Sequence, residues 1–297
     1  MTCPELLFML EFVILLAIVL ASLSVFCYFG KRTDKQFQSI VEREIELLDS
    51  RATDLHEMKK VQRDRLPSRL QAYIEDVCGP QSDYKDHVEV EQLGEFRLNT
   101  DSEWFPIESV SHALLSEAAF VWRAYLNPGS RFTIFARDRL SDGQGFMLLK
   151  PAYSPEIEDR TGAEISTSMV VRYLSEIPWF PAAILFNDSL QWTKDGGMSV
   201  GVSSEVNGVE ASGVFTFDSE GRIVKFETTE RFQETDDGFV QVPWSLDYSD
   251  YKELDGVEVP SRVEAAWTLE GKRFPYLRLH ITSAQYRAMK TDGDDES

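Results

Sequence analysis

The stretch from Arg262 to Leu269, RVEAAWTL, alternates between apolar and polar side chains, which is typical of a β-strand with one buried face. Its inward positions would be Val263, Ala265, Trp267 and Leu269. The same alternation recurs at Val88, Val90, Phe96 and Leu98, at Met198, Val200 and Val202, and at Leu277, Leu279 and Ile281. The sequence therefore predicts a mainly β protein of the α+β class.

Short turn signals separate these runs. They are Asp195-Gly196-Gly197, Asn207-Gly208, Asp218 to Gly221, Asp236 to Gly238, Asp255-Gly256 and Glu270-Gly271. Consecutive strands joined by short turns pair antiparallel, and strands with one polar face suit a sheet that is covered on one side only. We expect an antiparallel curved sheet, an open half-barrel, between residues 66 and 287.

A helix is predicted between the strands, from Ala163 to Glu176. Ile165, Met169 and Tyr173 recur at steps of four, and Pro178 follows the last turn. This helix is the natural cover for the concave face of the sheet.

The amino-terminal region predicts a membrane anchor over residues 1–30. From Phe12 to Phe29 no residue is charged, and a helix of that length covers roughly 27 Å, close to the thickness of a bilayer core. A cleaved signal peptide is the alternative, but it would require a basic start, and no Lys or Arg precedes this stretch.

A helical stalk is predicted over residues 31–65, ending at Leu66-Pro67 because proline disfavours helix at the residue before it. Its apolar stripe consists of Val41, Ile45, Leu48, Ala52 and Leu55. Two heptads are too few to decide between a stalk that self-associates into a homo-oligomer and a lone helix lying against the body. The acidic tail, residues 288–297, is expected to be disordered.

Composition excludes several functions. Fifty acidic against 30 basic side chains give a net charge of -20, which repels nucleic acid. Cys3, Cys27 and Cys78 cannot build a disulfide framework, and the four histidines form no metal-binding motif and would be ordinary surface residues. There is no phosphate-binding loop or nucleophile elbow, so we expect neither a metal nor a cofactor.

The most unusual stretch is RYLSEIPWFP, from Arg172 to Pro181. Arg172 and Glu176 lie one helical turn apart, where they could form a buried ion pair between helix and sheet. Alternatively, Arg172 lies at a cavity rim and holds a carboxylate or a lipid phosphate. Trp179 and Phe180, between two prolines, either plug the sheet or line a pocket.

A family resemblance rests on this stretch together with others along the body. The others are Leu66-Pro67 with Leu70 and Tyr73, Gly94 to Arg97, Phe120-Val121-Trp122, Asp142-Gly143 with Gly145, Arg231, Pro243-Trp244, Asp255 to Pro260, and Trp267 through Tyr276. The chain resembles, from about Leu66 to Tyr286, a widespread prokaryotic family classed only as a domain of unknown function. Its sheet resembles the half-barrel of periplasmic lipoprotein carriers such as LolA.

Three functional hypotheses follow. The first is a membrane-tethered binding module for a lipid or another hydrophobic ligand, with Trp122, Trp179, Phe180 and Trp244 lining the cavity and Arg172, Glu176 and Arg231 at its polar mouth. The second is an interaction protein of the cell envelope that associates through the stalk. The third is an enzyme using Arg172, Glu176, Asp142 and Arg231, although no motif identifies catalytic residues.

The side of the membrane stays open. Lys31, Arg32 and Lys35 follow the uncharged stretch and favour a cytoplasmic body under the positive-inside rule. The acidic, lysine-poor body and the family resemblance favour an extracytoplasmic one.

Overall fold

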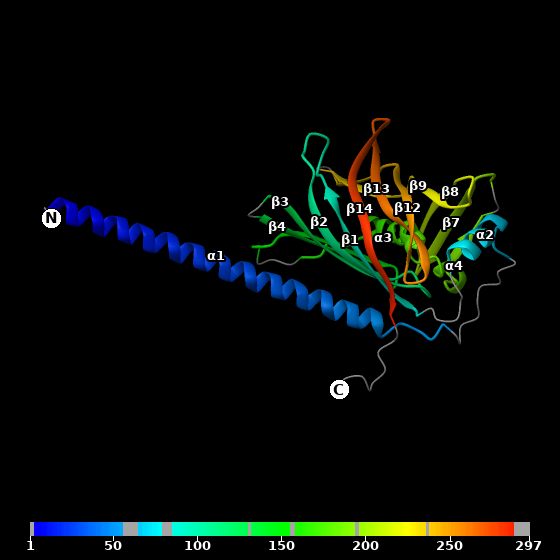
Figure 1. Cartoon of the computed structure of the whole chain (residues 1–297), viewed down its shortest axis with the longest axis horizontal. Coiled ribbons are helices and arrows are strands. Elements are labelled where there is room, and N and C mark those ends of the chain that lie inside the picture. Colours follow the sequence, from blue (N-terminus) through cyan, green and yellow to red (C-terminus); the bar gives the residue numbers. More distant parts are fainter. Residues whose placement is uncertain are drawn as a thin grey trace.

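The computed structural model describes residues 3–55, 65–78, 85–129, 132–154, 158–193, 196–235 and 238–287 (Figure 1). Among the first 29 residues, only the side chains of residues 14–18, 20 and 28 are described. The helices are α1 (Cys3–Asp49), α2 (Ser68–Val77), α3 (Ala163–Glu176), the 3₁₀ turn η2 (Ile177–Trp179) and α4 (Ala183–Phe186). The strands are β1 (His87–Phe96), β2 (Phe105–Leu114), β3 (Phe120–Gly129), β4 (Phe132–Ser141), β5 (Gln144–Pro151), β6 (Leu190–Trp192), β7 (Ser199–Val206), β8 (Val209–Phe217), β9 (Ile223–Thr228), β10 (Phe232–Thr235), β11 (Gly238–Gln241), β12 (Trp244–Leu254), β13 (Val257–Leu269) and β14 (Lys272–Arg287).

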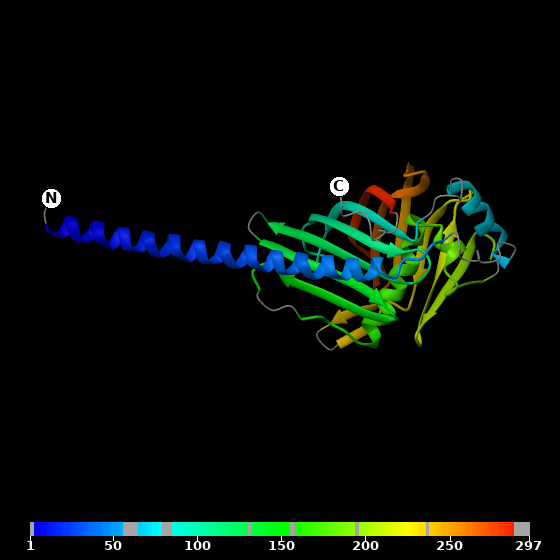
Figure 2. The ribbon, with the colours of Figure 1, turned by 90° about the horizontal axis from the view of Figure 1, so that it is seen from below.

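Twelve of the described strands form one antiparallel sheet, in the order β5-β4-β3-β2-β1-β14-β13-β12-β9-β8-β7-β6. The sheet curves without closing, because β5 and β6 remain at opposite edges (Figure 2). β10 and β11 form a separate hairpin. The predictions of a mainly β protein and of an open antiparallel sheet are therefore confirmed.

Two-residue turns with left-handed backbone at both positions join several of the strand pairs. They are Asp142-Gly143, Asn207-Gly208, Asp255-Gly256 and Glu270-Gly271, with φ between 50° and 83°. Such turns match the right-handed twist of the flanking strands, which is why Asn-Gly and Asp-Gly predict hairpins well. The last three of these turns stand where the sequence predicted them.

Alternation along the strands correctly predicts most of the inward positions. Val263 and Ala265 on β13 are buried, as are Leu279 and Ile281 on β14. Leu98 is an error, because β1 ends two residues earlier and the leucine is 59% exposed. Met198 is likewise exposed, just before the start of β7.

The position of α3 follows from the strand order. Since β5 and β6 lie at opposite edges, the chain between them must cross one face of the sheet. It does so as α3, which lies inside the curve (Figures 1 and 2), with Ile165, Met169 and Tyr173 buried. The predicted covering helix is confirmed, with the predicted bounds.

Two tyrosine hydroxyls connect α3 to the sheet. Tyr173 on α3 donates to the carbonyl of Leu114 at 2.9 Å, and Tyr248 on β12 donates to the carbonyl of Ser175 at 2.6 Å. Both rings are buried, and burial raises the pKa of Tyr173 and of Tyr248 above the ordinary value near 10. The neutral hydroxyl is therefore part of the folded state.

This geometry predicts a loss of stability in alkali. The pKa of both tyrosines is higher in the folded state than in the unfolded state. Their contribution to the free energy of unfolding is therefore complete below the unfolded-state pKa of about 10 and decreases as the pH rises above it. We expect the free energy of unfolding, measured by urea titration, to fall between about pH 10 and 12. Tyr248→Phe should lower stability by about 1 kcal/mol at pH 8 and weaken the alkaline slope. An unchanged slope would contradict this account.

The amino-terminal helix lies on the other face of the sheet. Phe37, Val41 and Leu48 of α1 are buried in an apolar cluster with residues such as Val121 and Phe135. These strand positions alternate with those that face α3, so α1 and α3 cover opposite faces. Over this part the apolar stripe is buried against the chain's own sheet, which is what a lone helix lying against the body would give. Self-association through the remaining helix stays a prediction.

The helix ends earlier than predicted, at Asp49 instead of Arg65. Beyond Asp49 the chain makes a tertiary contact that a continued helix would not allow. The backbone N–H and the hydroxyl of Thr53 donate to the carboxylate of Asp86, at 2.8 and 3.1 Å. Residues 56–64 of the predicted stalk and the predicted tail lie outside the described residues.

A search of the described residues for a helix suited to crossing a bilayer found none.

Ion pairs support the contact between α1 and the sheet. Arg137 on β4 is 1% exposed and binds the carboxylates of Glu44 and Asp159. Arg51, just after α1, binds Glu117 at 2.7 Å and Asp142 at 2.9 Å. A guanidinium this deep requires carboxylate partners, because an unpaired buried charge is strongly destabilising.

Glu44→Gln should therefore lower the free energy of unfolding by about 3 kcal/mol, since it leaves Arg137 short of one carboxylate. Glu42→Gln on the exposed side of the same helix serves as the matched control, with an expected change below about 0.5 kcal/mol. Thermal and urea unfolding of the full chain measure both. Equal effects of the two variants would show that the pair does not hold the helix.

Candidate functional site

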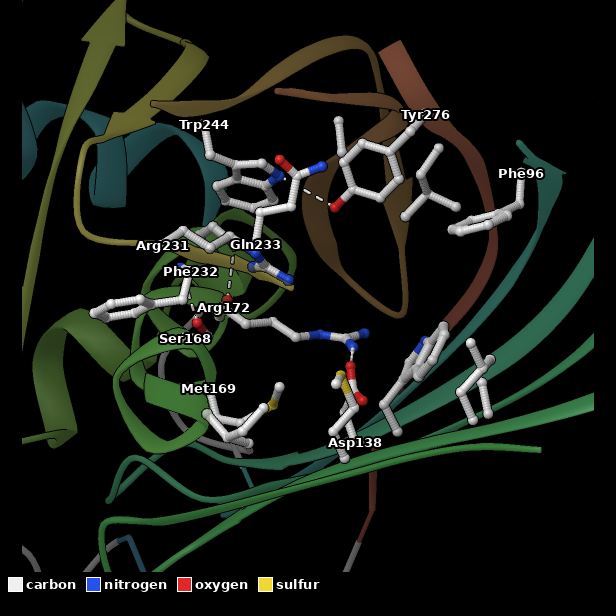
Figure 3. A pocket seen from close by; sticks show the side chains of 18 of the residues that line it. Phe96, Asp138, Ser168, Met169, Arg172, Arg231, Phe232, Gln233, Trp244 and Tyr276 are labelled. Carbon is white, nitrogen blue, oxygen red and sulfur yellow. Dashed lines mark hydrogen bonds and ion pairs between the residues drawn. The ribbon is translucent and has the colours of Figure 1, made fainter. Parts of the chain in front are cut away.

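A cavity of about 310 Å³ lies between α3 and the concave face of the sheet (Figure 3). Its apolar lining comes from both halves of the sheet and from the helix. These residues include Phe96, Ile107, Trp122, Leu126, Met147, Met169, Trp179, Leu246, Trp244, Trp267 and Tyr276. The sheet therefore offers a mostly apolar pocket with large aromatic walls.

Strand alternation explains why these rings share one space. Trp122, Trp244 and Trp267 occupy inward positions on β3, β12 and β13. The same concave face carries Ala136 and Ala265, which are buried and have only a methyl side chain. Since alanine does not reach across to α3, the rings surround a space and do not fill it.

The charged side chains of Arg172, Glu176 and Asp138 meet at one place in the cavity lining. Arg172 on α3 donates from Nε to Glu176 at 2.7 Å and forms a second ion pair with Asp138 on β4. Glu176 also accepts a hydrogen bond from Ser111 at 3.0 Å. Arg172 therefore forms the predicted buried ion pair with Glu176 and also lines the cavity. That it holds a ligand stays a prediction.

The guanidinium of Arg172 is stabilised from two sides. Burial alone would lower the pKa of Arg172, but Glu176 and Asp138 outweigh burial and raise it. The guanidinium also lies over the ring of Trp122 at 4.2 Å, and the indole of Trp122 donates to Gln92 at 3.1 Å. Arg172 therefore remains a cation and serves to position α3.

Arg231, in the loop between β9 and β10, differs in its partners. Its guanidinium lies 4.2 Å from the ring centre of Trp244 and 5.8 Å from that of Trp267. Within the described ranges it forms no ion pair, and its Nη1 is buried with no hydrogen-bond partner. Burial lowers the pKa of Arg231, and the nearby charge of Arg172 adds to this effect.

Six of the seven predicted ligand-binding residues line this cavity. They are Trp122, Arg172, Glu176, Trp179, Arg231 and Trp244. Phe180 does not, because it packs against the ring of Tyr173, with ring centres 5.5 Å apart. That any of them binds a ligand stays a prediction.

The acid predicted for an enzymatic cluster is elsewhere. Asp142 lies in the turn after β4 and binds Arg51, so it does not join Arg172, Glu176 and Arg231. Asp138 takes that place, and the sequence analysis missed it. The sequence pattern could have identified Asp138, because this carboxylate stands at an inward position of its strand, between Ala136 and Leu140.

The β10–β11 hairpin lies along the cavity and supplies Phe232, Gln233 and Phe239 to its lining. The backbone N–H of Phe232 donates to Ser168 on α3 at 3.1 Å. Arg160 forms an ion pair with Glu234 at the same place. This hairpin was not predicted, because part of its sequence was assigned only to a turn.

The histidine prediction was wrong for two of the four residues. His87 and His112 are buried side by side on β1 and β2, with ring nitrogens 3.1 Å apart, because inward and outward faces of these strands are both covered. His87 also contacts Asp49 of α1, and His112 lies 3.6 Å from Glu89. No cluster able to hold a metal ion occurs among the residues described.

The pairing of Arg172 leads to a stability prediction. Arg172→Met should lower the free energy of unfolding by about 3 to 5 kcal/mol, because Asp138 and Glu176 would remain buried without a cation. Adding Asp138→Asn and Glu176→Gln should recover much of this loss. Urea unfolding of the single and triple variants measures it, and a triple variant no more stable than the single one would refute the ion-pair account.

The chain has low similarity to solved structures. A LolA superfamily protein from Nitrosomonas europaea is similar in structure, with 10% identity, 75% of this chain and 94% of that chain covered, and a TM-score of 0.36. A DUF1329 family protein from Desulfovibrio piger is similar with 10% identity, 75% and 92% covered, and a TM-score of 0.39. No curated protein matches the chain.

The resemblance that rests on RYLSEIPWFP and the surrounding body is confirmed by a family match over residues 64–286. This match covers most of the chain and nearly the whole predicted β domain. The chain belongs to the family of unknown function DUF6920.

Proposed function

We propose that the protein binds a lipid or another hydrophobic small molecule in the cavity between α3 and the sheet, and that residues 12–29 tether it to a membrane. The observation that carries the binding proposal is the cavity itself, about 310 Å³ in volume and lined mainly by aromatic and aliphatic side chains. Ligand sites are typically apolar pockets with a few polar groups, which is the composition found here.

The energetics of an empty cavity support the same proposal. Leaving the apolar walls of a pocket in contact with water costs about 25 cal/mol for each Å² of apolar surface that a ligand would otherwise cover. Water makes few hydrogen bonds in a space that few polar groups face. A hydrophobic ligand that occupies the cavity removes this cost.

Polar contacts around the cavity keep it from collapsing. Arg172 connects α3 to β4 through Asp138, and Tyr248 connects the end of α3 to β12. These bonds have defined lengths and directions, so they hold the helix over the sheet at a set distance. The space beneath the helix is thereby preorganised for a ligand.

Photolabelling tests the proposal directly. The full chain is irradiated with a neutral diazirine fatty alcohol, and the adducts are mapped by mass spectrometry. We expect adducts on cavity residues such as Met147, Met169 and Tyr276. Ala265→Phe should reduce this labelling about tenfold, because the added ring occupies the space that a buried alanine leaves.

Val214→Phe, at a position 43% exposed on β8, is the matched control and should leave the labelling unchanged. Circular dichroism and thermal unfolding show that both variants fold. Adducts confined to the outer face of the sheet, or labelling of the cavity that Ala265→Phe does not reduce, would refute the proposal.

A further inference from the structure

We infer that the molecule held in this cavity is a single-chain amphiphile whose head group carries one negative charge, and that Arg231 binds that charge. The inference rests on the proposed function and names the class of ligand. It starts from the one arginine of the described cavity lining that forms no direct ion pair with a described residue.

Three arginines line the described cavity, and two of them are paired. Arg172 binds Asp138 and Glu176, and Arg160 binds Glu234. Arg231 forms no ion pair with any described residue, and its Nη1 is buried without a hydrogen-bond partner. A guanidinium is always charged at physiological pH, so its donors require acceptors.

The aromatic contacts of Arg231 hold it in place without using its donors. The guanidinium lies over Trp244 at 4.2 Å, which engages the face of the planar group. The N–H bonds of a guanidinium lie in its plane, so stacking leaves them unoccupied. Figure 3 shows the side chains of Arg231 and Arg172 directed into the same space between α3 and the strands. A bound molecule can supply the acceptor that Nη1 of Arg231 lacks among the described residues.

The charges around the cavity limit the ligand to at most one negative charge. Asp138 and Glu176 make their direct contacts with Arg172, and these three groups together carry one negative charge. Arg231 brings the sum to zero. A head group with one charge leaves a single excess charge in a poorly hydrated site, whereas a dianion leaves two, which the low dielectric penalises far more strongly.

The size and lining of the cavity indicate the rest of the molecule. The volume of about 310 Å³ is near the lower end of the range for ligand pockets, roughly 300 to 1,000 Å³. The aromatic side chains of Tyr276 and Phe96 line the cavity on the side away from Arg231 (Figure 3). One acyl chain suits this space better than two. A carboxylate and a phosphodiester share the required charge.

Competition against the neutral photolabel tests the inference on the full chain. Two anionic competitors, palmitate and lysophosphatidylglycerol, are each compared with a neutral counterpart, methyl palmitate and monopalmitoylglycerol. For the wild type we expect one anionic competitor to be at least about tenfold more potent than its counterpart, since charge-assisted hydrogen bonds provide that much discrimination. Arg231→Gln should abolish the difference and keep binding of the neutral molecules.

Which anion shows the preference identifies the head group as a carboxylate or a phosphodiester. Arg231→Lys, which keeps the charge, should retain part of the preference. Arg262→Gln removes the same charge from a side chain that is 65% exposed on the outer side of β13, and it should change nothing. Because Arg231 forms no ion pair with a described residue, Arg231→Gln should unfold at or above the wild-type temperature without ligand. Palmitate or lysophosphatidylglycerol should raise the unfolding temperature of the wild type more than that of Arg231→Gln.

Equal potency of anionic and neutral competitors in the wild type would overturn the inference and leave the proposed function standing. A preference that survives in Arg231→Gln would also overturn it. Absence of any cavity labelling would instead refute the proposed function itself.

Discussion

The ion pairs of Arg172 with Asp138 and Glu176 are the interaction on which the interior of this protein depends. They join the helix that crosses the open side of the sheet to strand β4, in a place where few other polar contacts occur. Removal of Arg172 would leave two buried carboxylates without a cation, which is strongly destabilising. The helix is thereby held over the sheet, and the cavity persists beneath it.

Two arginines in the same cavity have different roles because their partners differ. Arg172 is saturated by carboxylates and is therefore a positioning residue. Arg231 is supported by indole rings, which stabilise a cation without supplying hydrogen-bond acceptors. A site of this kind combines a rigid scaffold with one unsatisfied donor group, and such a combination is what gives an apolar pocket a preferred orientation for its ligand.

The sheet is covered on both faces, which accounts for several features that its alternating pattern did not reveal. On the outer face, α1 packs over β2 to β4 and turns Arg137, His87 and His112 into buried residues. Such polar groups are tolerated because the helix itself supplies their partners, Glu44 and Asp49. Helix and sheet are therefore complementary in charge as well as in shape.

The sequence by itself determined the helix from Ala163 to Glu176, several hairpin turns and the strands with clear alternation, such as β13 and β14. Alternation, Asn-Gly or Asp-Gly pairs and the four-residue period act over a few neighbouring residues. It also indicated most of the residues that line the cavity. Only the tertiary structure decided that Asp138 and not Asp142 meets Arg172, that Phe180 packs outside the cavity, and that α1 ends at Asp49. These outcomes depend on which distant strands pair and which segments cross them, and no local pattern encodes such contacts.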